Sequence, residues 1–176
     1  NVQLIPTPDV QFGVNNICEG SSLFVNNQTN YSGATNEVNY LWDFGDGNSS
    51  VLNSPTHLYG FAGDYSVTAI ATAVNGCADT LTKQVSVFPV PIVQSNIQPF
   101  YYFNQGAVNL AGTPSDGIFS GDGIVGNTFR PDLAGIGNHA LNFSYFDPNT
   151  GCGKSITYNV AVINKAIINN QPVSKR

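Results

Sequence analysis

The stretch that decides the fold is Tyr40-Leu41-Trp42-Asp43-Phe44-Gly45-Asp46-Gly47, in the first half of a chain of 176 residues. Side chains alternate between the two faces of a β-strand, so Tyr40, Trp42 and Phe44 share one face. Gly45-Asp46-Gly47 then supplies residue types that turn a chain. The stretch predicts a strand with an aromatic inner face that ends in a tight turn, with Trp42 as the core tryptophan of a β-sandwich.

The same strand pattern continues along the chain in short runs. Apolar and polar residues alternate in 66–70, 84–87 and 142–145, and turn residues such as Asn75-Gly76 separate the runs. No segment shows the apolar stripe of an amphipathic helix. We therefore predict an all-β protein made of two tandem immunoglobulin-like β-sandwiches.

A repeated spacing indicates two modules. Cys77 precedes Val85 by eight residues, and Cys152 precedes Val160 by the same interval. Pro89-Val90-Pro91 lies between the halves, where prolines would stiffen a short linker. We divide the chain into 1–7 (the tail of a preceding module or a linker), 8–89 and 90–163 (the two sandwiches) and 164–176 (a linker or the start of another module).

Charge is scarce and mostly negative. Charged residues make up 10% of the chain, the net charge is −5, and Lys83 is the only cation up to Phe129. Binding to phosphates needs clustered Lys and Arg, so we expect no nucleic-acid partner and no affinity for anionic membrane surfaces. No run approaches the roughly 20 apolar residues of a membrane helix, so we expect no direct membrane insertion.

Three elements of the first half resemble the polycystic kidney disease (PKD) domain family. They are Trp42-Asp43-Phe44-Gly45-Asp46-Gly47, then Pro55–Tyr59 with His57 at its centre, then Gly63–Val67. The resemblance implies an extracellular β-sandwich that acts as a spacer or interaction module. Tyr65 fits a tyrosine corner, in which the phenol bonds to the backbone a few residues upstream. Trp42 through Gly47, His57, Tyr59 and Tyr65 are thus predicted to be structural signature residues.

The second half resembles an immunoglobulin-like repeat of large Bacteroidetes surface proteins, including gliding-motility adhesins of the SprB type. The resemblance lies in 117–131, 134–137, 143–147 and Gly151-Cys152. It implies export through the type IX secretion system and display at the cell surface. The partners expected on this basis are neighbouring repeat modules and surface polysaccharide, with the fragment itself monomeric.

Residue types that carry catalysis are present, but their settings favour structural roles. We interpret Asp43 and Asp46 as turn carboxylates that accept backbone N–H groups, and His57 as a packing residue. No acid–base pair, nucleophile or metal cluster emerges, so we predict no catalytic residue and no cofactor. A structural calcium ion stays open, because Asp79 with Asn75 nearby offers oxygen ligands, although the 26–36 loop contains no acid.

The three cysteines leave one pairing that we favour. Cys18 lies just before a predicted strand at 21–26, and Cys77 lies just after one at 64–73. In an immunoglobulin-like sandwich we place both points at the same end, so we predict a Cys18–Cys77 disulfide with Cys152 as a free thiol or paired outside this chain.

An aromatic run, Phe100-Tyr101-Tyr102-Phe103, follows the predicted linker. Such a cluster would either pack against a neighbouring module or stack on sugar rings. Two functions follow from these observations. The first is a structural or adhesive segment of a large secreted or cell-surface bacterial protein, such as a gliding-motility adhesin. The alternative is an accessory carbohydrate-binding or spacer region of a secreted hydrolase.

Overall fold

The computed structural model describes residues 6–32 and 37–165, and the two predicted tail segments, 1–7 and 164–176, lie largely outside that range. The chain forms two compact units. The first comprises Asn1–Val90 together with Asn149–Cys152, and the second comprises Pro91–Pro148 and Gly153–Arg176. The division falls between Val90 and Pro91, inside the proline-bounded linker.

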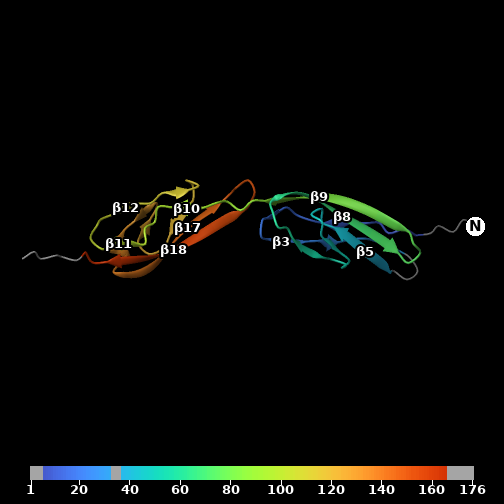
Figure 1. The fold of residues 1–176 in the computed structure, drawn as a ribbon, viewed down its shortest axis with the longest axis horizontal. Coiled ribbons are helices and arrows are strands. Elements are labelled where there is room, and N and C mark those ends of the chain that lie inside the picture. The colour runs from blue at the N-terminus through green and yellow to red at the C-terminus, as the bar shows by residue number, and fades with distance from the viewer. Residues whose placement is uncertain (1–5, 33–36, 166–176) are drawn as a thin grey trace, which may run out of the picture. The chain divides into compact units, whose positions relative to one another are not determined.

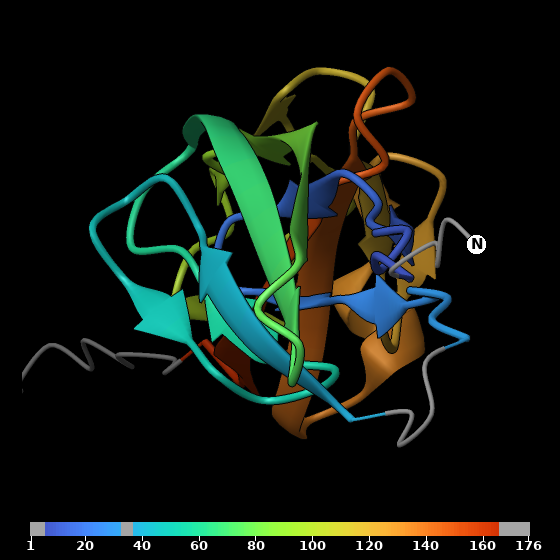
Figure 2. The same cartoon turned by 90° about the vertical axis from the view of Figure 1, so that its right-hand side faces the viewer.

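The first unit is a sandwich whose larger layer has five strands in the order β2-β9-β8-β5-β6 (Figures 1 and 2). Two small antiparallel pairs, β1-β4 and β3-β7, form the opposing layer. The strands of the larger sheet are β2 (Ile17–Cys18), β9 (Ala78–Phe88), β8 (Gly63–Ala73), β5 (Val38–Asp43) and β6 (Ser49–Ser50). Those of the smaller pairs are β1 (Phe12–Gly13), β4 (Asn26–Asn27), β3 (Ser22–Phe24) and β7 (Thr56–Leu58).

Alternating burial along β8 and β5 builds the core of this unit. Val67, Ala69 and Ala71 of β8 are buried, while the residues between them lie on the outer face of the sheet. Ala69 is the register partner of Trp42, and Ala71 is that of Tyr40. A small residue beside each large ring leaves the volume that a close-packed interior requires. The buried set is completed by Val10, Phe12, Leu23, Val25, Phe44, Tyr59, Val85 and Val87.

The second unit is also a sandwich. Its larger layer has four strands in the order β11-β18-β17-β14, faced by β12-β16-β15 and by the pair β10-β13. The larger sheet contains β11 (Phe100–Tyr102), β18 (Gly153–Ile163), β17 (Gly137–Phe146) and β14 (Ile118–Ser120). The remaining strands are β12 (Val108–Asn109), β16 (Thr128–Phe129), β15 (Ile124–Val125), β10 (Gln94–Ser95) and β13 (Gly112–Thr113). One helical turn, α1 (Pro131–Ala134), interrupts the strands.

Phe143 of β17 anchors the core of the second unit. Its ring is fully buried and lies directly over the backbone of Gly112 and Gly117, where any Cβ atom would overlap it. Phe119 packs against the same ring, with centroids 4.6 Å apart. Glycine at these two positions is therefore a packing requirement. With both units built from strands, the fold confirms the predicted all-β class and the two tandem sandwiches.

Candidate functional site

Trp42 fixes the segment that holds the signature residues. Its side chain is fully buried and meets the ring of Phe12 edge-on, with centroids 5.2 Å apart. The indole Nε1 donates a hydrogen bond of 2.8 Å to the Leu52 carbonyl oxygen. A buried tryptophan needs such a partner because an unpaired indole N–H would lose its bond to water.

The turn after β5 is held by its own carboxylates. Asp43 Oδ1 accepts from the backbone N–H of Gly45 at 2.8 Å, and Asp46 Oδ1 accepts from that of Asn48 at 3.0 Å. Gly45 has a positive φ of 77°, and a Cβ atom there would lie 2.8 Å from the Ser66 carbonyl oxygen. Glycine is thus required at this position both by conformation and by the neighbouring strand. These are the backbone contacts that the turn interpretation predicts.

His57 lies in an aromatic stack beside this turn. Its ring is parallel to Phe44 at 4.1 Å and meets Tyr59 edge-on at 4.6 Å. Its Nε2 is 2.7 Å from Asp46 Oδ2, and the two side chains are only 11% and 14% exposed. Burial opposes ionisation of Asp46, but hydrogen bonds from His57 and Asn48 outweigh it and hold the pKa of this carboxyl below its ordinary value.

Two tyrosines close the stack. Tyr59 is buried and donates from its hydroxyl to the Phe44 carbonyl oxygen at 3.0 Å. Burial, together with the nearby charges of Asp46, Tyr65 and Asp43, raises the pKa of Tyr59 to about 12. Tyr65 stacks on Tyr59 with centroids 4.0 Å apart and donates to the Phe61 carbonyl oxygen at 2.8 Å. This backbone bond four residues upstream has the geometry of a tyrosine corner.

The signature residues are bonded to one another and to nearby backbone groups. Asp46 and His57 are joined to each other, and Asp43 is joined to the turn. Asp79, the candidate calcium ligand, accepts from the backbone N–H of Val10 at 2.9 Å, and Asn75 donates to the Pro6 carbonyl oxygen at 2.9 Å. Within residues 6–32 and 37–165, no group of three or more His, Cys, Asp or Glu side chains is placed to bind a metal.

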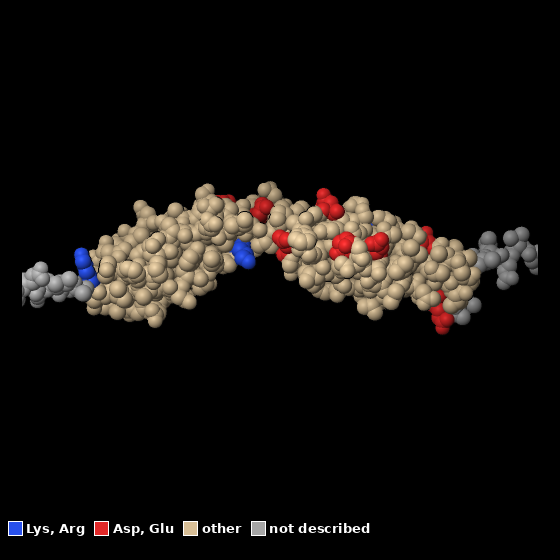
Figure 3. Space-filling view, viewed as in Figure 1, with Lys and Arg blue, Asp and Glu red and all other residues tan. Residues whose placement is uncertain are grey.

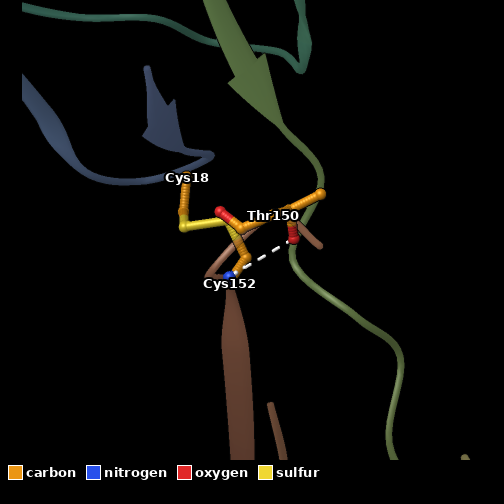
Figure 4. The surroundings of a disulfide bond; sticks show 3 residues. All are labelled: Cys18, Thr150 and Cys152. Atoms are coloured by element: carbon orange, nitrogen blue, oxygen red, sulfur yellow. Dashed lines mark hydrogen bonds between the residues drawn. A yellow bond between two sulfur atoms is a disulfide. The ribbon is translucent and has the colours of Figure 1, made fainter. Parts of the chain in front are cut away.

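The cysteine pairing differs from the prediction. Cys18 is bonded to Cys152, with Cα atoms 5.6 Å apart, and Cys77 is the free thiol (Figure 4). The backbone N–H of Cys152 also donates to Thr150 Oγ1 at 3.3 Å. The bond lies within the first unit, to which the 149–152 loop belongs.

Strand geometry explains why the predicted Cys18–Cys77 bond is wrong. Cys18 pairs with Phe88 at the last residue of β9, whereas Cys77 lies in the turn just before Ala78 at its first residue. A strand rises about 3.3 Å per residue, so the length of β9 separates the two cysteines by roughly 30 Å. A disulfide requires Cα atoms within about 7 Å.

The aromatic run of the second unit does not form one surface. Tyr101 is buried in the core against Phe129, with ring centroids 4.8 Å apart, and Phe103 packs partly against the same core. Phe100 is 49% exposed, and its ring meets that of Tyr102 edge-on at 5.8 Å. Because side chains alternate along β11, Tyr101 lies in the core while Phe100 and Tyr102 lie on the opposite face. Whether the exposed rings contact a sugar or a neighbouring module stays a prediction.

Sequence reasoning considered Asp46 and His57 one at a time and missed that they bind each other. The spacing of 11 residues spans a turn, strand β6 and a loop, so no local pattern joins them. It also missed the role of Gly112 and Gly117, which depends on the position of the Phe143 ring and which no local pattern signals.

The comparisons with known proteins agree with this architecture in the first half. Residues 5–88 match the family model of the PKD domain. The match confirms the predicted PKD domain. It ends at residue 88, so the resemblance of 91–163 to a Bacteroidetes surface repeat stays a prediction.

The curated relatives are collagenases and a metalloprotease. A microbial collagenase of Vibrio alginolyticus is 46% identical over 50 residues, 28% of this chain and 6% of the relative. The pre-pro-metalloprotease PrtV of Vibrio cholerae is 42% identical over 69 residues, 39% of this chain and 7% of the relative. Collagenase ColA of Clostridium perfringens is 32% identical over 85 residues. The chain spans less than a tenth of the length of each of these relatives.

Two solved PKD domains are similar to the first half. The PKD1 domain of Vibrio cholerae PrtV is 35% identical, with a TM-score of 0.40 over 47% of this chain and 98% of that chain. The PKD1 domain of Vibrio anguillarum Epp is 28% identical, with a TM-score of 0.42 over 47% of this chain and 95% of that chain.

No helix in the described part of the chain is both long and apolar enough to cross a membrane.

Proposed function

We propose that this chain is a non-catalytic accessory segment of a secreted hydrolase, in which the PKD domain and the second sandwich space the catalytic domain from its substrate or hold that substrate. The observation that carries the proposal is the set of bonds that the signature residues make. Asp43, Asp46 and His57 are the residue types of acid–base catalysis, yet Asp43 is bonded to the backbone of its own turn, and Asp46 and His57 are bonded to each other. Signature residues whose bonds hold the fold together fit a module that acts by positioning and binding.

The identity of the relatives supports a hydrolase over a gliding-motility adhesin. The matched proteins are collagenases and a metalloprotease, and the matched part is a small fraction of each. Most of each relative, with room for a catalytic domain, lies outside the matched region. The relatives thus support the second of the two functions that the sequence suggested.

An extracellular location is part of the proposal. Disulfides persist in oxidising compartments and are rare in the cytosol. The Cys18–Cys152 bond joins two segments of the first unit that are 134 residues apart in the sequence, so an oxidising compartment would preserve this link.

A chimeric enzyme tests the accessory role. The chain is fused to the catalytic domain of the Vibrio cholerae metalloprotease in place of that enzyme's own PKD region. We expect faster hydrolysis of insoluble collagen and unchanged hydrolysis of a soluble short peptide, compared with the catalytic domain alone. The isolated chain should hydrolyse neither. Equal rates on the insoluble substrate with and without the chain would contradict the proposal.

A further inference from the structure

One edge of the larger sheet in the first unit is open. Strand β6 pairs with β5 only through Trp42–Ser50 and Asp43–Ser49. Residues 38–41 of β5 pair with β8 along one side of the strand. Along the other side, the side of β6, no strand in the described part of the chain pairs with them. The first four residues of β5 therefore form an exposed strand edge.

The backbone groups that this edge presents can be assigned. The backbone N–H of Phe44 donates to the Asn48 carbonyl oxygen, so Phe44 points its polar groups toward β6. The direction of these groups alternates along a strand. Val38 and Tyr40 therefore direct their N–H and C=O groups to the open edge, while Asn39 and Leu41 direct theirs to β8.

The chain after β6 is held away from this edge by bonds of its own. If β6 continued in register, Leu52 would pair with Tyr40. Instead, the Leu52 carbonyl oxygen accepts from Trp42 Nε1 at 2.8 Å, and its N–H donates to Ser50 Oγ at 3.2 Å. The Asn53 carbonyl oxygen accepts from the Asn27 side chain at 2.9 Å. Both backbone groups of Leu52 are thus engaged elsewhere.

A groove of about 390 Å³ lies between the start of β5 and the chain after β6, and we call it the edge groove. It is lined by Val38, Asn39, Tyr40, Val51 and Asn53. The ring of Tyr40, one of these residues, stacks on Trp42 with centroids 6.3 Å apart. Val51 and Leu52 beside the groove are 73% and 63% exposed. Proteins usually protect such an edge with lysine, proline or a bulge, and residues 38–41 contain none of these.

We propose that the edge groove binds an extended basic peptide, which adds to β5 as an antiparallel strand. The class of partner, a stretch of protein substrate, rests on the proposed function, whereas the site rests on the geometry of β5. Strand addition would give the four polar groups of Val38 and Tyr40 their partners and cover the exposed side chains of Val51 and Leu52.

The negative charge of the first unit favours a peptide of positive charge. Residues 1–90 contain seven acidic residues and one lysine, a formal charge of −6. Figure 3 shows acidic side chains on the visible face of the first unit and, among its described residues, no basic ones on that face. Glu37 adjoins the groove at the start of β5 and is exposed. A peptide with lysine at its ends is therefore preferred over an acidic one.

A neutral sugar is the competing occupant, since Tyr40 with the amides of Asn39 and Asn53 would suit one. The peptide is favoured because the N–H and C=O groups of Val38 and Tyr40, which no strand among the described residues pairs with, match the alternating groups of a peptide backbone.

Amide hydrogen exchange measured by NMR on the whole chain tests the site. The probes are the capped peptide KTVTVTK, its acidic counterpart ETVTVTE, and cellohexaose. With KTVTVTK we expect the exchange of the Val38 and Tyr40 amides to slow by about tenfold or more, while other amides of the first unit keep their rates. Tighter binding of cellohexaose, or protection elsewhere, would overturn the peptide site.

Two variants separate the site from general stability. Val38→Pro removes an edge N–H without removing a bond to β8, so it should abolish peptide protection at Tyr40 while the thermal midpoint shows that the unit is folded. Glu37→Lys should weaken KTVTVTK binding by about threefold and strengthen ETVTVTE binding, as expected for one surface ion pair. Glu19→Lys is the matched control, because Glu19 adjoins the Phe88 end of β9, away from Val38.

The outcome of this test is independent of the chimera experiment. A chimera that gains activity while KTVTVTK leaves Val38 and Tyr40 unprotected would overturn the edge site alone. Protection by the peptide in a chimera without gain would overturn the accessory function and leave the site standing. Equal binding of the basic and acidic peptides would overturn the charge preference and with it the proposed partner.

Discussion

Breaking the Cys18–Cys152 disulfide should destabilise the first unit by about 4 to 5 kcal/mol. The bond closes a loop with a sequence separation of 134, for which the chain-entropy model gives about 5 kcal/mol. If the second unit stays folded while the first unfolds, the flexible loop still includes the 72 residues from Cys18 to Val90 (90 − 18), which gives about 4.4 kcal/mol. Either value approaches the whole stability of a small domain.

Tryptophan fluorescence reads this change in the first unit alone. Trp42 is the only tryptophan in the sequence and is buried in that unit. Cys152→Ser should lower the urea midpoint of the Trp42 transition by about 2 to 5 M, for a denaturant slope of about 1 to 2 kcal/mol/M. Cys77→Ser is the matched control, since it changes a cysteine that is not bonded, and it should leave the midpoint unchanged.

Thiol counting under denaturing, non-reducing conditions checks the pairing itself. The wild-type chain should show one thiol, that of Cys77, and the Cys77→Ser variant should show none. Equal urea midpoints for Cys152→Ser and the wild type would refute the entropic reasoning. A count of two thiols in Cys77→Ser, which retains only Cys18 and Cys152, would refute the Cys18–Cys152 pairing.

Three further predictions concern side chains within each unit. Gly117→Ala should destabilise the second unit by about 2 to 4 kcal/mol, because its Cβ would overlap the Phe143 ring, and a thermal melt should show no comparable loss for Gly60→Ala, which has open space around it. The pKa of Asp46 is lowered in the folded state, so its ionised form contributes stability when the pH is above the ordinary pKa of 3.8. That stability is lost as the pH falls through the folded-state pKa. Acid unfolding of Asp46→Asn should therefore be less steep than that of the wild type. The pKa of Tyr59 is raised to about 12, so its neutral form contributes stability below about pH 10 that is lost as the pH rises from 10 toward 12. The tyrosinate absorbance of the wild type should therefore show a late titration step that Tyr59→Phe lacks. A wild-type titration without that step would contradict the assignment.

Several structural features of the first unit follow from the residue types and their spacing along the chain. A strand alternates its side chains whatever its partner, so the aromatic face of Tyr40, Trp42 and Phe44 follows from spacing alone. Turn carboxylates bond to backbone groups two residues away, so the contacts of Asp43 and Asp46 also lie within a few residues. The tyrosine corner spans only four residues, from Tyr65 to Phe61. Each of these features depends on neighbours in the chain.

The sequence by itself determined the strand class and the PKD signature. The tertiary structure alone decided which cysteines meet, because Cys18 and Cys152 are 134 residues apart and the full length of β9 separates Cys18 from Cys77. It alone paired Asp46 with His57, placed Tyr101 in a core, and left β5 with an open edge because Leu52 is bonded to Trp42 and Ser50. The physical reason is that spacing along the chain does not encode which segments meet. This holds for cysteines 134 residues apart, and also for Asp46 and His57, which a turn, a strand and a loop separate.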